Sequence, residues 1–136
     1  MLEKFTEDII VIDEREYGRD DLGKIMAAFA GHTEKSDCDP KTKAFVVYGK
    51  HNILGIDVSS FVVEYNVYTG LITDYILYPA VPRGPVLASV AHLAKGEPDI
   101  YEDTFTTMAD YPMGGNRQIT IALTGGKGYY VLLMWM

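Results

Sequence analysis

The side chains best suited to acid–base chemistry are Glu64, Asp74 and Tyr75, which flank the turn-forming pair Thr69-Gly70. A two-residue turn at that pair sets Glu64 opposite Tyr75 on a polar face of the resulting hairpin. Asp74 then falls on the other face among aliphatic side chains, where burial raises the pKa of a carboxyl group unless a donor satisfies it. This pattern predicts a general acid–base group or a ligand-orienting group. The alternative interpretation is a hydrated Asp74 near an open sheet edge.

A second set of polar residues could bind a small anion. Asn116 and Arg117 follow two consecutive glycines, whose backbone freedom lets N–H groups converge on a ligand. Arg83 directly precedes an expected helix, whose N-terminal amides favour negative charge. Asn66 and Tyr68, on the polar face of the hairpin, are expected to complete the ligand-binding surface. The alternative is that both arginines are solvated loop residues.

The sequence contains no pattern for a metal, a cofactor or a nucleophile. His32, His51 and His92 share no ligand spacing, and Cys38 is the only cysteine, which excludes an intrachain disulfide and a thiolate metal cage. No serine lies in the Gly-x-Ser-x-Gly sequence of a nucleophile elbow. We therefore expect no metal site and no cofactor.

The glycines around Lys127 have the composition of a phosphate-binding loop but not its spacing. Such a loop needs Gly-Lys followed by Ser or Thr, between a strand and a helix, whereas here Gly128 follows Lys127 and the strand-like segment YYVLLMWM comes next. The glycines therefore predict a hairpin turn. The closing segment has no polar alternation, so both of its faces need cover. This predicts a homodimer with a subunit contact near Trp135.

Length and charge narrow the class of protein. The 136 residues, with 48% hydrophobic residues, predict one globular domain spanning 1–136. A net charge of −7 argues against binding to nucleic acid or to an anionic membrane surface. Eight of the 19 acidic residues lie within residues 1–21, which predicts either a solubilising edge or a docking surface for a basic partner. We find no signal peptide and no membrane span, and expect a cytoplasmic protein.

Hydrophobic periodicity and turn residues predict an α+β domain with the order β-α-β-β-β-α-β-β-β. Two short helices can cover only one face of a sheet, so we expect a single, mainly antiparallel sheet of six to seven strands with both helices on one face. The expected strands are 8–13, 44–49, 53–68, 71–78, 100–108, 118–123 and 129–135, and the expected helices are 18–31 and 85–96.

These features predict a small acidic binding module, a homodimer that binds a partner protein or a small anionic ligand. The order helix, three strands, helix, three strands resembles that of the small acidic chaperones of type III secretion, although the chain has an additional N-terminal strand and lacks their closing helix. That resemblance implies dimerisation and a protein partner. The alternative is a small enzyme with a carboxylate and tyrosine acid–base site on the open sheet face.

Overall fold

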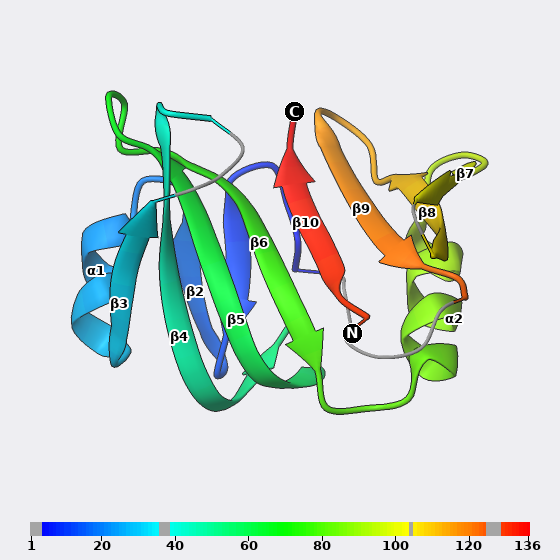
Figure 1. Cartoon of the computed structure of the whole chain (residues 1–136), viewed down its shortest axis with the longest axis horizontal. Coiled ribbons are helices and arrows are strands. Elements are labelled where there is room, and N and C mark those ends of the chain that lie inside the picture. Colours follow the sequence, from blue (N-terminus) through cyan, green and yellow to red (C-terminus); the bar gives the residue numbers. More distant parts are fainter. Residues whose placement is uncertain (1–3, 36–38, 104, 125–128) are drawn as a thin grey trace.

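The computed structural model describes residues 4–35, 39–103, 105–124 and 129–136, which form one curved sheet with two helices (Figure 1). The strand order is β2-β1-β4-β5-β6-β10-β9-β8-β7, and β3 pairs with the first half of β4. All of these pairings are antiparallel. The elements are β1 Ile9–Ile12, β2 Arg15–Gly18, α1 Leu22–Ala28, β3 Gly31–Lys35, β4 Thr42–Ile53, β5 Ile56–Asn66, β6 Ile72–Pro79, α2 Arg83–Leu93, β7 Asp99–Asp103, β8 Thr106–Pro112, β9 Arg117–Ala122 and β10 Val131–Trp135.

The α+β class, the antiparallel sheet and the two helices agree with the sequence interpretation, but six to seven strands was too low a number. β2 lies just before the expected first helix, β3 lies in an expected polar loop, and the single strand expected at 100–108 is part of the hairpin β7–β8. β2 and β3 expose most of their side chains and are held by main-chain pairing. They therefore lack the hydrophobic alternation that reveals a strand in a sequence. The resulting element order also differs from the one on which the resemblance to secretion chaperones rested.

Gly31 shows how β3 is held against β4. A Cβ atom at this position would lie 2.4 Å from the carbonyl oxygen of Val46 and 2.8 Å from Cζ of Phe45. The expected helix extended to Gly31, but α1 ends at Ala28 and its C-cap residue, Phe29, is already extended. Glycine is thus required here for close approach of two strands and not to end the helix.

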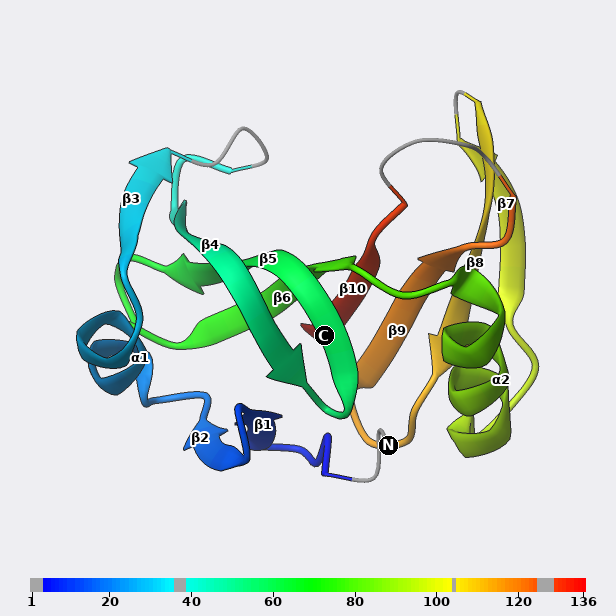
Figure 2. The same cartoon turned by 90° about the horizontal axis from the view of Figure 1, so that it is seen from below.

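The inner face of the sheet carries the main hydrophobic core. Ile25 of α1 and Val86 and Val90 of α2 belong to the same buried cluster as the sheet residues, so both helices pack on this face. In Figure 2 the hairpin β1–β2 and both helices lie on this side of the sheet. The strand residues of this cluster include Phe45, Val47, Phe61, Val63, Tyr75, Leu77, Val131, Leu133, Trp135, Ile119, Ile121, Ala109 and Tyr111.

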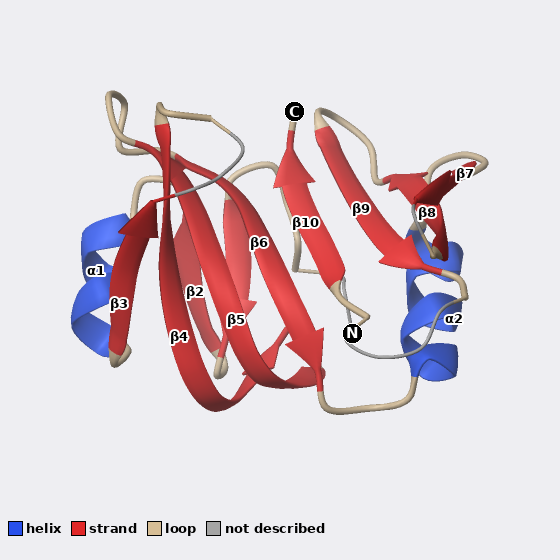
Figure 3. Ribbon diagram, in the orientation of Figure 1, coloured by secondary structure: helices blue, strands red, loops and turns tan. Residues whose placement is uncertain are grey.

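The outer face, opposite the core, carries a second and smaller apolar cluster. Ala44, Val46 and Val62 are buried there, and Ile76 and Tyr78 pack against them. Figure 3 shows α1 and α2 at the two ends of the sheet, and in Figure 2 neither helix lies over the outer face between β3 and β7. An uncovered sheet face with apolar residues is the natural place for a ligand or a partner.

Neither helix of the described chain is long and apolar enough to cross a membrane. The glycine turn around Lys127 falls at residues 125–128, outside the described residues. β9 and β10 on either side of it pair antiparallel, so a strand follows the glycines where a phosphate-binding loop would require a helix.

Candidate functional site

A β-bulge in β6 decides which side chains of the β5–β6 hairpin share the outer face. Glu64 pairs with Asp74, but the next pair is Tyr65 with Ile72, so Thr73 is an extra residue on β6. One extra residue reverses the facing of the side chains beyond it. Asp74 therefore lies on the outer face beside Glu64, and the expectation that it faces the core was wrong.

The turn of this hairpin is longer than the expected two residues. The Asn66 N–H donates to the Leu71 carbonyl at 3.0 Å, and the Gly70 N–H donates to the Asn66 carbonyl at 2.8 Å. Oδ1 of Asn66 accepts hydrogen bonds from the N–H groups of Tyr68 and Thr69, at 2.9 and 3.1 Å. Asn66 is thus a turn-capping residue, and Tyr68, 78% exposed, lies at the tip of the turn.

Tyr75 lies on the inner face and is fully buried. Its ring centroid is 6.1 Å from that of Trp135, and no described residue hydrogen-bonds to its hydroxyl group. Burial, and then the negative charge of Asp21, raises the pKa of Tyr75. The bulge therefore separates Tyr75 from Glu64 and Asp74, and the three do not form one acid–base group.

Glu64 and Asp74 form a carboxyl pair at directly opposed positions of β5 and β6. Asp74 is only 8% exposed, and the Thr73 hydroxyl lies 2.8 Å from its Oδ1. Burial, and then a hydrogen bond and charge repulsion from Glu64, raises the pKa of Asp74 to about 8. The rise in the pKa of Asp74 that the sequence predicted is present, and a second carboxyl group contributes to it beside burial. At neutral pH the pair therefore holds a proton.

This carboxyl pair belongs to a pocket of about 450 Å³ on the outer face. We call it the outer-face pocket. The size falls within the range of small-ligand sites, about 300–1,000 Å³. Its lining residues are Thr42, Glu64, Thr73, Asp74, Ile76, Tyr78, Tyr130, Leu132 and Met134. The pocket thus combines an apolar surface with carboxyl groups at one side.

Charge on the outer face has one sign. Residues paired across strands share a face, so the rows of paired residues that pass through Asp74, Ile76 and Tyr78 define the outer face from β3 to β7. These rows, within the described residues, contain no Lys or Arg. Their acidic members are Glu34, Glu64, Asp74, Asp99 and Asp110. Burial, and then Glu64 and Glu34, also raises the pKa of Tyr78. The face is therefore a site of negative potential that favours a cation.

The anion site expected from Arg83, Asn116 and Arg117 is not assembled. Arg83 opens α2, whereas Arg117 lines a pocket with Leu93 and Lys95 at the other end of that helix. Leu93 lies ten residues beyond Arg83 on α2, a rise of about 15 Å along the helix axis, so the two arginines lie near opposite ends of that helix.

The two arginines also have other contacts. The Arg117 guanidinium donates to the carbonyl groups of Phe5, Met113 and Gly114, so it fastens the N-terminal segment to the turn before β9. Asn116 Nδ2 donates to the Met136 carbonyl at 3.2 Å. Arg83 lies 4.7 Å from the centroid of the Tyr129 ring.

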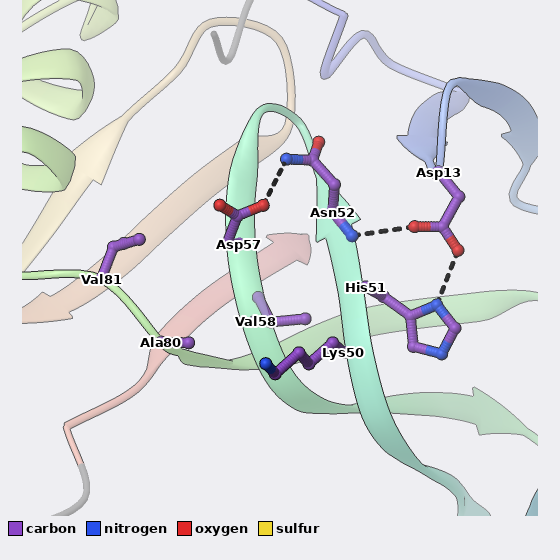
Figure 4. Close-up of a pocket in the computed structure, with 8 residues that line it drawn as sticks. All are labelled: Asp13, Lys50, His51, Asn52, Asp57, Val58, Ala80 and Val81. Carbon is purple, nitrogen blue, oxygen red and sulfur yellow. Dashed lines mark hydrogen bonds and ion pairs between the residues drawn. The ribbon is translucent and has the colours of Figure 1, made fainter.

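A second pocket, also of about 450 Å³, contains an Asp–His pair that the sequence did not reveal (Figure 4). Oδ2 of Asp13 lies 2.6 Å from Nδ1 of His51, and Oδ1 of Asp13 accepts the Asn52 N–H at 2.8 Å. Asn52 donates in turn to Asp57. Asp13 is 38 residues from His51 in the chain, and only the pairing of β1 with β4 brings them together. No spacing rule could have identified this pair.

An Asp–His pair can serve as a general base when a substrate group lies within reach. Here the other residues of the pocket include Lys50, Val58, Ala80 and Val81 and no serine or cysteine. The His51 ring packs edge-on against Phe29 and Phe61. The hydrogen bonds of Asp13 fix the β1–β2 turn to β4, and the ring contacts of His51 join β4 to β5 and to the end of α1, which is a structural role.

No group of three or more His, Cys, Asp or Glu side chains in the described residues could hold a metal ion. Cys38 lies outside those residues. Comparison of the chain with models of protein families, with curated proteins and with solved structures finds no match in any of the three.

Proposed function

We propose that this protein is a small binding module whose outer-face pocket takes an organic cation with an apolar body. One observation carries the proposal: a carboxyl pair, Glu64 and Asp74, sits at the edge of an apolar pocket that no helix covers. A buried carboxyl pair lowers the stability of the fold unless a proton or a cation neutralises it. A residue arrangement that costs stability is typical of a ligand site.

The charge of the pocket favours a cation over the small anion expected from the sequence. Leu132, Met134 and Ile76 supply the apolar contact surface, and Tyr78 and Tyr130 can stack on a cation or an aliphatic chain. An anion would instead meet the two carboxyl groups, without a basic residue among those that line the pocket.

The volume of the pocket favours a small molecule over a protein partner. Stable protein interfaces cover about 800 Å² on each partner, whereas a pocket of about 450 Å³ suits a ligand of modest size. The homodimer expected from the last strand would have to use this same face, because Val131, Leu133 and Trp135 are covered by the chain's own core. Light scattering distinguishes a ligand site from a subunit interface on this face. A ligand site predicts a monomer of 15.2 kDa. A dimer that dissociates when Leu132 is changed to Asp would indicate a subunit interface.

The test compares three ligands with the same tail: hexylamine, hexanol and hexanoate. Titration calorimetry or NMR should show the amine binding more tightly than the alcohol and the acid. The double variant Glu64→Gln, Asp74→Asn should lower the affinity for the amine by about 1.5–3 kcal/mol, as loss of a charged hydrogen bond does. Asp57→Asn, in the other pocket, is the matched control and should leave it unchanged. Equal binding of all three ligands, or none, would contradict the proposal.

A second candidate function is acid–base catalysis by the same carboxyl pair. It is favoured by the pKa of about 8 at Asp74, because such a group can donate and accept a proton near neutral pH. The two functions differ in the fate of the ligand. A binding module returns the bound cation unchanged, whereas an enzyme converts it at a rate that Asp74→Asn abolishes.

A further inference from the structure

One oxygen of the buried Asp74 carboxyl group receives no hydrogen bond from the protein. Asp74 is more than nine-tenths buried and lines the outer-face pocket, and no N–H or O–H group of the described residues donates to its Oδ2. The Thr73 hydroxyl lies 2.8 Å from the other oxygen, Oδ1, and 3.2 Å from the Glu64 carbonyl oxygen. A buried carboxyl oxygen without a donor lowers the stability of the fold. Oδ2 is therefore suited to a donor that a ligand supplies.

Without a ligand, the carboxyl pair satisfies itself with a proton. Glu64 lies directly opposite Asp74 on the neighbouring strand, and the two carboxyl groups hydrogen-bond to each other. Ionised carboxylates only accept hydrogen bonds, so this contact needs a proton on one of the two groups. Burial and the contact with Glu64 also raise the pKa of Asp74 to about 8, which keeps that proton bound at neutral pH. The pair is thus a site for one positive charge, either a proton or the head of a ligand.

The other groups that face the pair supply no positive charge to it. Among the described residues, Tyr78 and Tyr130 line the pocket beside the pair. On β3, two strands from Glu64, the titratable groups are Glu34 and His32, which contact each other at 3.1 Å. The residues that β4 and β10 place on this face do not titrate: Thr42, Ala44, Leu132 and Met134. The charge that neutralises the pair therefore comes from solution.

Primary and quaternary ammonium heads differ in what they offer to Oδ2. The rings of Tyr78 and Tyr130 can stack on a quaternary ammonium group. Such a group has no N–H bond, so it would leave Oδ2 of Asp74 buried and without a donor. A primary ammonium group has three N–H bonds and can donate to Oδ2 and to Glu64 together. Hydrogen bonds between an ammonium group and a carboxylate are among the strong ones in proteins. The oxygen without a donor therefore favours a primary amine.

We propose that the ligand of the outer-face pocket has a primary ammonium head, which donates an N–H bond to Oδ2 of Asp74 and replaces the proton that Glu64 and Asp74 otherwise share. This inference rests on the proposed function, since it takes the outer-face pocket to be the ligand site. One cation enters and one proton leaves to the solvent, so the net charge of the site does not change. Binding therefore competes with protonation of the pair and strengthens as the pH rises.

Titration calorimetry with hexylamine and hexyltrimethylammonium, which have the same tail, tests this proposal. Hexylamine should bind at least tenfold more tightly, as expected for a hydrogen bond to a charged group. An alkylamine stays protonated near neutral pH, as lysine does with a pKa of about 10.4, so a released proton comes from the protein. Titrations in two buffers with different heats of ionisation should show release of about one proton near pH 6.5. The affinity for hexylamine should rise about tenfold between about pH 6 and pH 7.

Carbon-13 NMR of the carboxyl groups locates the released proton. Saturation with hexylamine near neutral pH should shift the Glu64 and Asp74 resonances toward the ionised form, and Asp74→Asn identifies the Asp74 signal. Asp57→Asn, in the other pocket, is the control and should keep the wild-type affinity and proton release.

The outcomes distinguish this inference from the proposed function. Equal binding of the quaternary ligand would overturn the primary ammonium head, and hexylamine binding without proton release would overturn the exchange. Release of a proton without a change at the Glu64 and Asp74 resonances would overturn its assignment to this pair. In each of these cases the proposed function stands. If neither ligand binds, both are wrong.

Discussion

Asp74→Asn should remove a pH dependence from the stability of the fold. The native carboxyl group has a pKa of about 8, against 3.8 for an ordinary aspartate. The native state therefore holds a proton that the unfolded chain releases above about pH 4. For a group with a raised native pKa, the stabilising contribution is complete below the unfolded value and is lost as the pH rises through the native value. Asparagine keeps the shape and the contact with Thr73 but carries no such proton.

The magnitude follows from the number of protons held in each state. Between about pH 5 and pH 7 the native state binds one more proton at this site than the unfolded state, so the free energy of unfolding falls by about 1.4 kcal/mol per pH unit. The loss over this window is about 2.7 kcal/mol in the wild type, and Asp74→Asn should lack it. The variant should thus gain stability relative to the wild type as the pH rises.

Urea unfolding at several pH values between about 5 and 7, with the linear extrapolation to water, measures this difference directly. Asp20→Asn, which changes an exposed acid in the same way, is the matched control and should follow the wild type. Parallel curves for the wild type and Asp74→Asn would refute the reasoning. Parallel curves would mean that Asp74 is ionised in the native state and that the Glu64–Asp74 pair binds no proton in this pH range.

Three further predictions concern structural residues. Arg117→Ala should destabilise the protein by about 2–3 kcal/mol in denaturant titrations, because a guanidinium that binds three backbone carbonyls is removed. An unchanged unfolding midpoint would show that these hydrogen bonds do not stabilise the fold. Asp13 adopts φ 50°, so Asp13→Gly should be more stable than Asp13→Ala by about 1 kcal/mol, whereas equal midpoints would show that the turn is unstrained. Gly31→Ala should lower the melting temperature, since its Cβ meets the Val46 carbonyl oxygen, and a wild-type melting curve would contradict the close approach.

The segments with regular hydrophobic patterns were predicted well from the sequence. β4, β5, β6, β9, β10 and both helices lie within a few residues of the expected ranges. In α1 and in most of these strands the apolar residues recur with a period of 3.6 or two residues, which the sequence shows directly. β10 is a continuous apolar run, and α2 lies between the helix-starting Pro85 and the helix-ending Gly96. β3 was missed because its side chains are all exposed, and only its main chain pairs with β4. The four glycine and lysine residues 125–128 lie outside the described residues.

The candidate site depended on features that no pattern encodes. Glu64 and Asp74 were both chosen from the sequence, but the bulge at Thr73 set them side by side and sent Tyr75 into the core. The hydrogen bonds of the turn at Asn66, which close it beyond the expected two residues, form only in the folded hairpin.

The pairing of strands distant in the chain decided which other candidate residues lie close together. His51 meets Asp13, and Asp110 joins the face of Asp74, only because strands distant in the chain become neighbours in the sheet. Arg83 and Arg117 were expected together, yet they lie at opposite ends of α2. The sequence by itself determined which residues are apolar, charged or able to turn. The sheet order decided which of them meet, because contacts across strands depend on register and on the order of the strands, and both are properties of the whole fold.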